Sequence, residues 1–232
     1  MTNAPPVLTL RTVPIFPLTG VVLLPSCLLP LHVFEPRYRN LVEDAMEAER
    51  TIGMIQPRTP SMVPARDHSP QIEASGTDAA EEAPATYPVG CIGRIEQCEA
   101  QSGGRFLIVL RGMQRFRVVR ELKLERGYRR VEADPSEFAA DLYESEIEVD
   151  PQPVLDALQQ NRNAEVDFDQ LKDLSGPTVV NGLAAALPFS PAEKQALLEA
   201  EGPEARRDLL ASLLGMGFDL KALATDEPSP IN

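Results

Sequence analysis

Apolar residues in the first fifty positions change their spacing at Pro36. Before it, residues 11–33 alternate short apolar runs with four prolines. Because proline fixes φ and removes a backbone donor, this pattern predicts short strands at sheet edges or strand ends, with a turn at Gly20. After Pro36, which suits a first helical turn, apolar residues recur at the helical positions Tyr38, Leu41, Val42, Ala45 and Met46. We therefore expect strands followed by one amphipathic helix.

A strand-rich segment is expected after this helix. Residues 52–55 form a short apolar run, and the runs at 89–98 and 105–110 are separated by Gln-Ser-Gly-Gly, which is a strong hairpin signal. Gly112 is expected to begin another turn. Further strands are expected around Phe116 and at residues 128–133 and 142–149. Short strands at this spacing are typical of a small barrel rather than a parallel sheet.

The period of the apolar residues becomes helical after Pro151. Three prolines, at positions 177, 191 and 203, each suit the first turn of a helix. Ser190 and Glu193 have the spacing of a capping box, in which the serine caps the helix and the glutamate reaches back. The predicted fold class is therefore α+β, with a β-rich domain over residues 1–150 and a helical subdomain over residues 151–225.

Residues 57–88 differ in composition from the segments around them. They carry six prolines among many Ala, Ser, Asp and Glu residues. Such a segment cannot bury enough apolar area to offset the entropy cost of ordering it. The composition predicts a disordered insertion, and a functional lid is the alternative.

Charge and cysteine content narrow the classes of function. The net charge of −13 repels nucleic-acid phosphates and acidic membrane surfaces. The N-terminus has no basic signal segment and no apolar run is long enough to span a bilayer, so a cytoplasmic protein without membrane contact is expected. Cys27, Cys91 and Cys98 form no CxxC pair, which indicates reduced thiols rather than a disulfide framework or a zinc site.

The sequence contains no recognisable catalytic constellation. It has no GxxxxGK[ST], GxGxxG or GxSxG motif. His32 lies among apolar residues and His68 lies in the insertion, so neither has partners at metal-ligand spacing. The four lysines lie in charged or helical-surface contexts, so none stands out as the base of a serine–lysine dyad. We expect no enzyme activity, no cofactor and no metal, and an enzyme that uses the cleft between the domains is the remaining alternative.

Three ordered motifs carry a family resemblance. They are VPIFPL at 13–18 followed by VLLP at 22–25, LPLHVFEPRY at 29–38, and VGCIG at 89–93 with LRG at 110–112 and RFRV at 115–118. Over about residues 10–218 the chain resembles the N-terminal substrate-recognition (LON) domain of ATP-dependent Lon proteases, in a free-standing bacterial form. The resemblance implies a PUA-like β pseudo-barrel followed by a C-terminal α-helical bundle. It also implies a module that helps to select damaged or unfolded polypeptides, without the ATPase and peptidase domains of the proteases.

Two functions remain open on this basis. The first is a non-catalytic module that binds unfolded or client polypeptides and works with a separate protease or chaperone. Strands interrupted by proline could offer a free edge or an apolar groove for such clients. The binding residues are expected around Phe16, Leu18, Phe34 and Tyr38. Phe34 and Tyr38 are also expected to anchor the first helix, with Glu35 and Arg37 pairing with strand residues such as Arg111 or Arg115 and the acids near them.

RNA binding is the alternative, because PUA-like barrels elsewhere bind RNA. Residues 105–130 carry nine basic and two acidic side chains, a local charge of +7. The candidate basic patch consists of Arg111, Arg115, Arg117 and Arg120. Alternating arginines on a strand often pair with carboxylates, however, and the rest of the chain carries −20. Nucleic acid is therefore the less expected partner.

Overall fold

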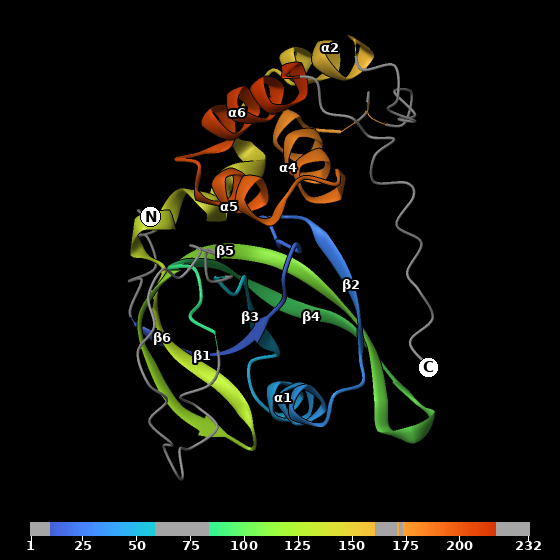
Figure 1. Ribbon diagram of the computed structural model, residues 1–232, viewed down its shortest axis with the longest axis vertical. Coiled ribbons are helices and arrows are strands. Elements are labelled where there is room, and N and C mark those ends of the chain that lie inside the picture. Colours follow the sequence, from blue (N-terminus) through green and yellow to red (C-terminus); the bar gives the residue numbers. More distant parts are fainter. Residues whose placement is uncertain (1–9, 59–83, 161–170, 172–173, 217–232) are drawn as a thin grey trace, which may run out of the picture.

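The computed structural model describes residues 10–58, 84–160, 171 and 174–216. Most of the segment predicted to be a disordered insertion, residues 59–83, lies outside these residues. The strands are β1 (Arg11–Pro17), β2 (Leu28–Val33), β3 (Thr51–Ile55), β4 (Val89–Gln101), β5 (Arg105–Glu125) and β6 (Tyr128–Asp134). The helices are α1 (Pro36–Glu47), α2 (Gln152–Gln160), α4 (Gly176–Ala186), α5 (Pro191–Glu199) and α6 (Pro203–Gly215), with 3₁₀ turns at η1 (Ser102–Gly104) and η2 (Ser136–Glu146) (Figure 1).

The strands form one sheet that closes on itself. Their order is β2-β5-β4-β3-β1-β6, and β5 also pairs with β6. This second pairing is possible because β5 is long: its first part pairs with β2 and its last part with β6. β1, β3, β4, β5 and β6 therefore make a ring of hydrogen-bonded strands, which we call the strand ring. β2 stays at the end of the order, with one edge that pairs with no other described strand.

An apolar cluster with members from all five strands of the ring packs around Phe116, which is fully buried. The cluster consists of Val13, Ile15, Ile55, Ile92, Phe116, Val131 and Ala133. Two glycines make room for the phenyl ring: a Cβ at Gly53 would lie 3.1 Å from Phe116 Cζ, and one at Gly90 would lie 2.7 Å from it. The strands can approach this closely because these two positions carry no side chain.

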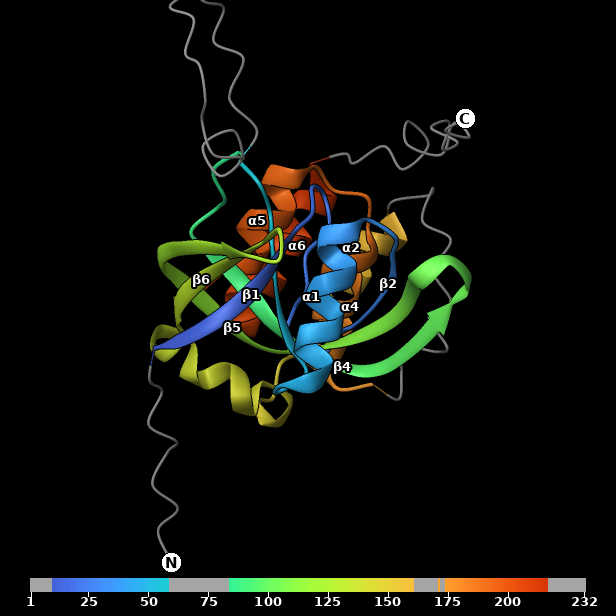
Figure 2. The same ribbon diagram turned by 90° about the horizontal axis from the view of Figure 1, so that it is seen from below.

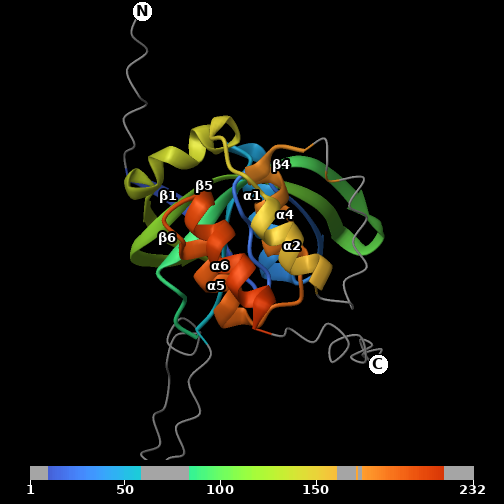
Figure 3. The same cartoon turned by 90° about the horizontal axis from the view of Figure 1, so that it is seen from above.

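Helices lie at both ends of the strand ring. In Figure 1, α2, α4, α5 and α6 gather at one end and α1 lies at the other. The view from above shows the first group in front of the strands (Figure 3), and the view from below shows α1 (Figure 2). Buried residues of the strands and of both helical groups belong to one continuous apolar cluster, so the two parts of the chain share a core.

Several predicted elements are confirmed. α1 begins at Pro36 and buries Tyr38, Leu41, Val42 and Ala45. β4 and β5 form the predicted hairpin around η1. The capping box at the start of α5 is present: the Ser190 hydroxyl accepts a hydrogen bond from the Glu193 N–H, and the Glu193 carboxylate accepts one from the Ser190 N–H. Each of these elements is determined by residues close to one another in the sequence, so the spacing of those residues is enough to predict it.

The sequence predicts that the prolines lie in edge strands or at strand ends. This prediction fits β2, which is an edge strand, and Pro17, which ends β1, but it is wrong for Pro14, which lies inside β1. β1 pairs in parallel with β3 and antiparallel with β6, so both of its edges are used. Its ladder with β3 starts at Ile15, one residue after Pro14. Pro14 therefore precedes that ladder, which is how an inner strand accommodates it.

The predicted turn at Gly112 is wrong, because this residue lies inside β5. Its N–H donates to the Cys27 carbonyl and its own carbonyl accepts from the Ser26 N–H, both at 2.8 Å. A Cβ at this position would lie 2.0 Å from the Leu24 carbonyl oxygen. Because this glycine has no side chain, the segment before β2 can pack directly against β5 here. The chain does not turn at this position.

The predicted strand at residues 142–149 is also wrong. The chain forms the 3₁₀ turns of η2, with a non-helical break at Phe138. Phe138, Asp141 and Glu144 are buried and lie three residues apart, a spacing that places side chains on one face of a 3₁₀ helix. Two of these three buried side chains are acidic, and acidic residues are normally expected to face solvent. The prediction fails because the arginines that make their burial favourable lie far away in the sequence.

Candidate functional site

Two arginines attach the C-terminal helices to the rest of the fold through the end of α5. The last carbonyls of a helix have no partner within the helix, and they attract positive charge. Arg115 of β5 donates to the carbonyls of Leu198 and Ala200, at 2.9 and 2.5 Å, and pairs with Asp141 at 2.7 Å. Both members of this ion pair are buried. β5, η2 and α5 are therefore held together at one point.

The second arginine, Arg206 of α6, is completely buried. Its guanidinium donates to the Leu197 carbonyl at 2.9 Å, to Glu144 Oε1 at 2.5 Å and to Asn181 Oδ1 at 2.6 Å. Asn181 in turn donates to the Pro25 carbonyl at 3.1 Å. This network connects η2, α4, α5 and α6 with the segment that leads into β2.

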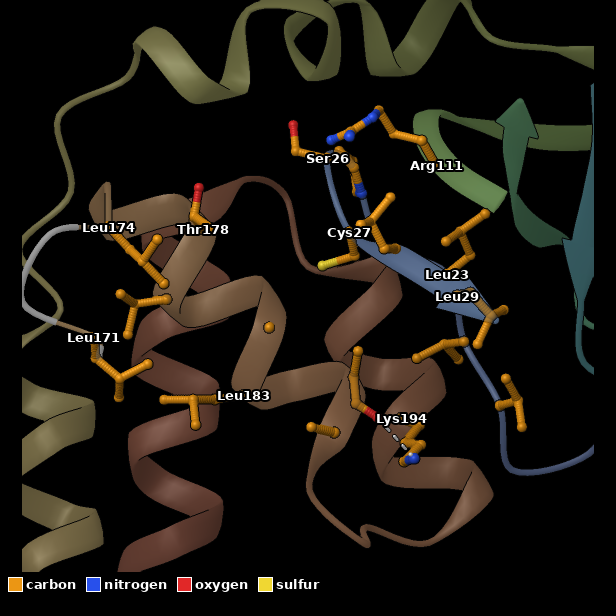
Figure 4. Close-up of a pocket in the computed structure, with 18 residues that line it drawn as sticks. Leu23, Ser26, Cys27, Leu29, Arg111, Leu171, Leu174, Thr178, Leu183 and Lys194 are labelled. Carbon is orange, nitrogen blue, oxygen red and sulfur yellow. Dashed lines mark hydrogen bonds between the residues drawn. The ribbon is translucent and has the colours of Figure 1, made fainter. Parts of the chain in front are cut away.

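An apolar cleft of about 700 Å³ lies beside this network. One wall is β2 with the segment before it, including Leu23 and Leu29, and the other is α4, including Leu183 (Figure 4). Its polar groups are few, and Figure 4 places Arg111 at one end and Lys194 at the other. The cleft therefore offers mostly apolar contact, as small-molecule and peptide sites do.

The thiol of Cys27 also lines this cleft. Burial raises the pKa of Cys27 to about 11. A thiol with this pKa is protonated at neutral pH, and the thiolate is the nucleophilic form. Cys27 therefore contributes an apolar surface to the cleft and no nucleophile.

The outer face of β2 carries exposed apolar and aromatic side chains next to the unpaired edge. Side chains on a strand alternate between faces, so Leu31 and Val33 point into the core while the intervening residues point outward. We call the exposed set, with one residue from β5, the β2 patch: Leu28, Pro30, His32, Phe34 and Leu107. Leu107 is paired with His32 in register, and the His32 and Phe34 rings lie 6.2 Å apart, edge to face.

The structure separates the four residues predicted to bind polypeptides. Phe16 and Tyr38 are buried and stack on each other with ring centroids 4.0 Å apart, so they join β1 to α1. Leu18 is half-buried. Phe34 is 61% exposed and does not anchor the first helix, which corrects that expectation. Phe34 alone among the four belongs to the β2 patch.

Sequence reasoning missed the contribution of Leu28 and His32 to this surface. The available signal was the alternation along β2, in which positions 28, 30, 32 and 34 share one face. The expected pairing of Glu35 and Arg37 with β5 arginines is also wrong, because these two residues pair with each other at 2.8 Å.

The predicted basic patch is largely neutralised by carboxylates. Arg111 pairs with Glu96, Arg117 pairs with Glu137 at 2.7 Å, and Arg120 pairs with Glu132 at 2.5 Å. Arg115 is buried and belongs to the helix attachment described above. Seven of the nine basic residues between positions 105 and 130 have such a partner. Little of the local charge is therefore left for phosphate groups.

Within the described part of the chain, no helix is long and apolar enough to cross a membrane. Nor do three or more His, Cys, Asp or Glu side chains gather there closely enough to hold a metal ion.

Comparison with known proteins gives consistent results. The family model described as the ATP-dependent protease La (LON) substrate-binding domain matches residues 12–215. Lon protease 2 of Sorangium cellulosum is 30% identical over 142 residues, which are 60% of this chain and 16% of that protein. Lon protease 2 of Myxococcus xanthus is 26% identical over 229 residues, which are 95% of this chain and 25% of that protein. The chain thus spans a quarter or less of the length of these relatives.

Solved structures agree with the family model. The Lon N-terminal domain protein from Xanthomonas campestris is 28% identical, with a TM-score of 0.57, and the match covers 87% of this chain and 98% of that one. The N-terminal domain of the Mycobacterium avium complex Lon protease is 19% identical, with a TM-score of 0.56, and the match covers 90% of this chain and 100% of that one. The latter likeness supports the fold alone, which is the mixed α+β fold of Lon N-terminal domains. From the family match and these structures, we conclude that the chain belongs to the family of LON substrate-binding domains.

Proposed function

We propose that this chain is a non-catalytic module that binds extended, apolar segments of client polypeptides through the β2 patch. One observation carries the proposal: β2, one edge of which pairs with no other described strand, is flanked by exposed Leu28, His32 and Phe34. Apolar groups gathered on a protein surface commonly mark an interaction site. The description of the family as a substrate-binding domain points in the same direction.

The edge of β2 suits an extended peptide. Such a peptide can add a strand to a free sheet edge, where backbone hydrogen bonds supply affinity and alternate side chains supply selectivity. Pro30 removes one donor from β2, so the edge favours a short stretch of pairing over a continuous ladder. Apolar client side chains would then contact Phe34 along the strand and Leu28 at the mouth of the cleft.

The strand ring is proposed to be a PUA-like pseudo-barrel, and helices α2, α4, α5 and α6 are proposed to belong to its helical bundle. The pairing of β5 with both β4 and β6, which closes the ring, supports the first assignment. The proposal does not use RNA, because most arginines of β5 and β6 already have carboxylate partners.

Fluorescence anisotropy with a labelled, permanently unfolded polypeptide tests the function. Phe34→Ser should weaken binding about tenfold, the effect of removing one well-placed aromatic contact. Tyr143→Ser is the matched control, because Tyr143 is 50% exposed and lies on η2, outside the β2 patch. Equal affinities for the wild type and Phe34→Ser would refute the proposed site.

A salt series separates the two functions considered above. Apolar polypeptide binding should change little between 50 and 200 mM salt, whereas binding to a labelled RNA through phosphate contacts should fall steeply over roughly this range. RNA binding without polypeptide binding would contradict the proposal and support the alternative.

A further inference from the structure

The apolar cleft contains a positive charge that the described part of the fold does not neutralise. Lys194 of α5 lines the cleft and is only 8% exposed. Its ammonium group has three donors, and its one hydrogen bond within the described residues goes to the Ala185 carbonyl at 3.1 Å. Burial lowers the pKa of Lys194, and no nearby carboxylate raises it. A buried charge without a counter-ion is unfavourable, so this position favours an anion.

The α4 wall of the cleft has space that a larger side chain could fill. Gly182 lies inside α4, and a Cβ at this position would meet no atom within 4 Å. Ala185 and Ala186 add two more small side chains to the same wall. A glycine inside a helix is less favourable than an alanine, so local helix stability does not favour it. Its effect here is to keep open a cleft of about 700 Å³, which is a typical size for small-molecule sites.

The lining favours an aliphatic chain over a peptide backbone. Several of the backbone groups on the β2 side are already paired: the Ser26 N–H with Gly112, and the Cys27 N–H with Leu24. Arg111, at the other end of the cleft, is engaged by Glu96. A peptide in the cleft would bury amide groups with few partners, which is costly, whereas an aliphatic chain has no such groups.

We propose that this cleft binds an aliphatic monocarboxylate of medium chain length. The carboxylate lies against the Lys194 ammonium group, and the chain runs along Gly182 and Leu183 toward Leu29. This ligand site goes beyond the proposed polypeptide function, because the β2 patch shares with the cleft only Leu28 at its mouth.

Isothermal titration calorimetry with decanoate tests the site, with decanol as the uncharged ligand of the same chain length. The wild type should bind decanoate saturably at one site, at least tenfold more tightly than decanol. Lys194→Met should lower the affinity for decanoate at least tenfold, to that of decanol. Gly182→Leu should remove binding of both ligands, because the leucine fills the space beside α4. Far-UV circular dichroism confirms that both variants are folded.

Four results would overturn the proposal. Three of them are no saturable decanoate binding by the wild type, undiminished binding by Lys194→Met, and undiminished binding by Gly182→Leu. Displacement of decanoate by an apolar peptide with a free C-terminus, but not by its amidated form, would assign the cleft to a polypeptide end and would also overturn it. Fluorescence anisotropy with the unfolded polypeptide, measured on the same variants, shows whether the β2 patch still binds polypeptide. Failure of the cleft proposal can therefore be told apart from failure of the proposed function.

Discussion

Replacement of Arg206 by methionine should lower the free energy of unfolding by about 3–5 kcal/mol. Arg206 is completely buried and donates to Glu144, Asn181 and the Leu197 carbonyl. Methionine fills a similar space and supplies none of these hydrogen bonds. The Arg206→Met variant therefore isolates the polar contribution to the attachment of the helices.

The size of the effect comes from Glu144. This carboxylate is only 2% exposed, and its Oε2 atom has no hydrogen-bond partner among the residues that the structure describes. Without Arg206 it becomes an uncompensated buried charge, which accounts for the 3–5 kcal/mol and for a fall in melting temperature on the order of 10 °C. Adding Glu144→Gln removes the charge. The double variant should therefore lose less than the sum of the two single variants, by about 1–3 kcal/mol.

Urea unfolding followed by far-UV circular dichroism measures these differences, because the chain contains no tryptophan for fluorescence. Arg207→Met is the matched control: the neighbouring Arg207 forms a surface pair with Asp208 at 2.7 Å, and its loss should cost less than about 1 kcal/mol. A loss below about 1 kcal/mol for Arg206→Met, or strict additivity with Glu144→Gln, would refute the reasoning.

Three further predictions concern stability and can be measured by the same urea titration. Ser190→Ala should cost about 1 kcal/mol, because it removes the cap of α5, and an unchanged midpoint would contradict the role of the capping box. Gly112→Ala should cost about 1–3 kcal/mol, because the new Cβ meets the Leu24 carbonyl at 2.0 Å, and a neutral result would show that the segment before β2 moves freely. Lys194→Met should stabilise the protein by about 1 kcal/mol at pH 7. Burial lowers the pKa of Lys194 in the folded state below its usual value of 10.5, so between these two values the unfolded chain binds more protons than the folded protein. The wild type therefore becomes more stable as the pH rises through this window, and the stability gained by Lys194→Met should be smaller at pH 10 than at pH 7. An equal or larger gain at pH 10 would contradict this.

The sequence predicts the parts of the fold that neighbouring residues specify. The helix after Pro36, the β4–β5 hairpin and the cap at Ser190 each depend on residues close in sequence. The burial of Asp141 and Glu144 does not, because the arginines that make it favourable lie on β5 and α6. Without knowledge of its partner, an acidic residue is expected to face solvent. The sequence therefore predicts a strand at residues 142–149, where the structure has the end of η2.

The candidate site divides in the same way. Phe34 directly follows β2 and continues the outward-facing positions of that strand, two residues beyond His32, so its side chain is exposed. The prediction that Phe34 anchors the helix rests on its place just before the helix start. The cleft could not be predicted, because it forms where β2 and the segment before it meet α4 and Lys194, about 150 residues later in the chain. Only the folded chain brings these segments together.

The closure of the strand ring has a consequence for how the protein is made on the ribosome. Val13 of β1 pairs with Val131 of β6, so one edge of β1 waits for roughly 120 further residues. At about 5–20 residues per second, this wait lasts on the order of ten seconds. During that time one edge of β1 is unpaired, and an unpaired edge can associate with other nascent chains. Pro14 and Pro17 interrupt the run of N–H donors along β1, which limits the pairing that the strand can offer to another chain before β6 is made.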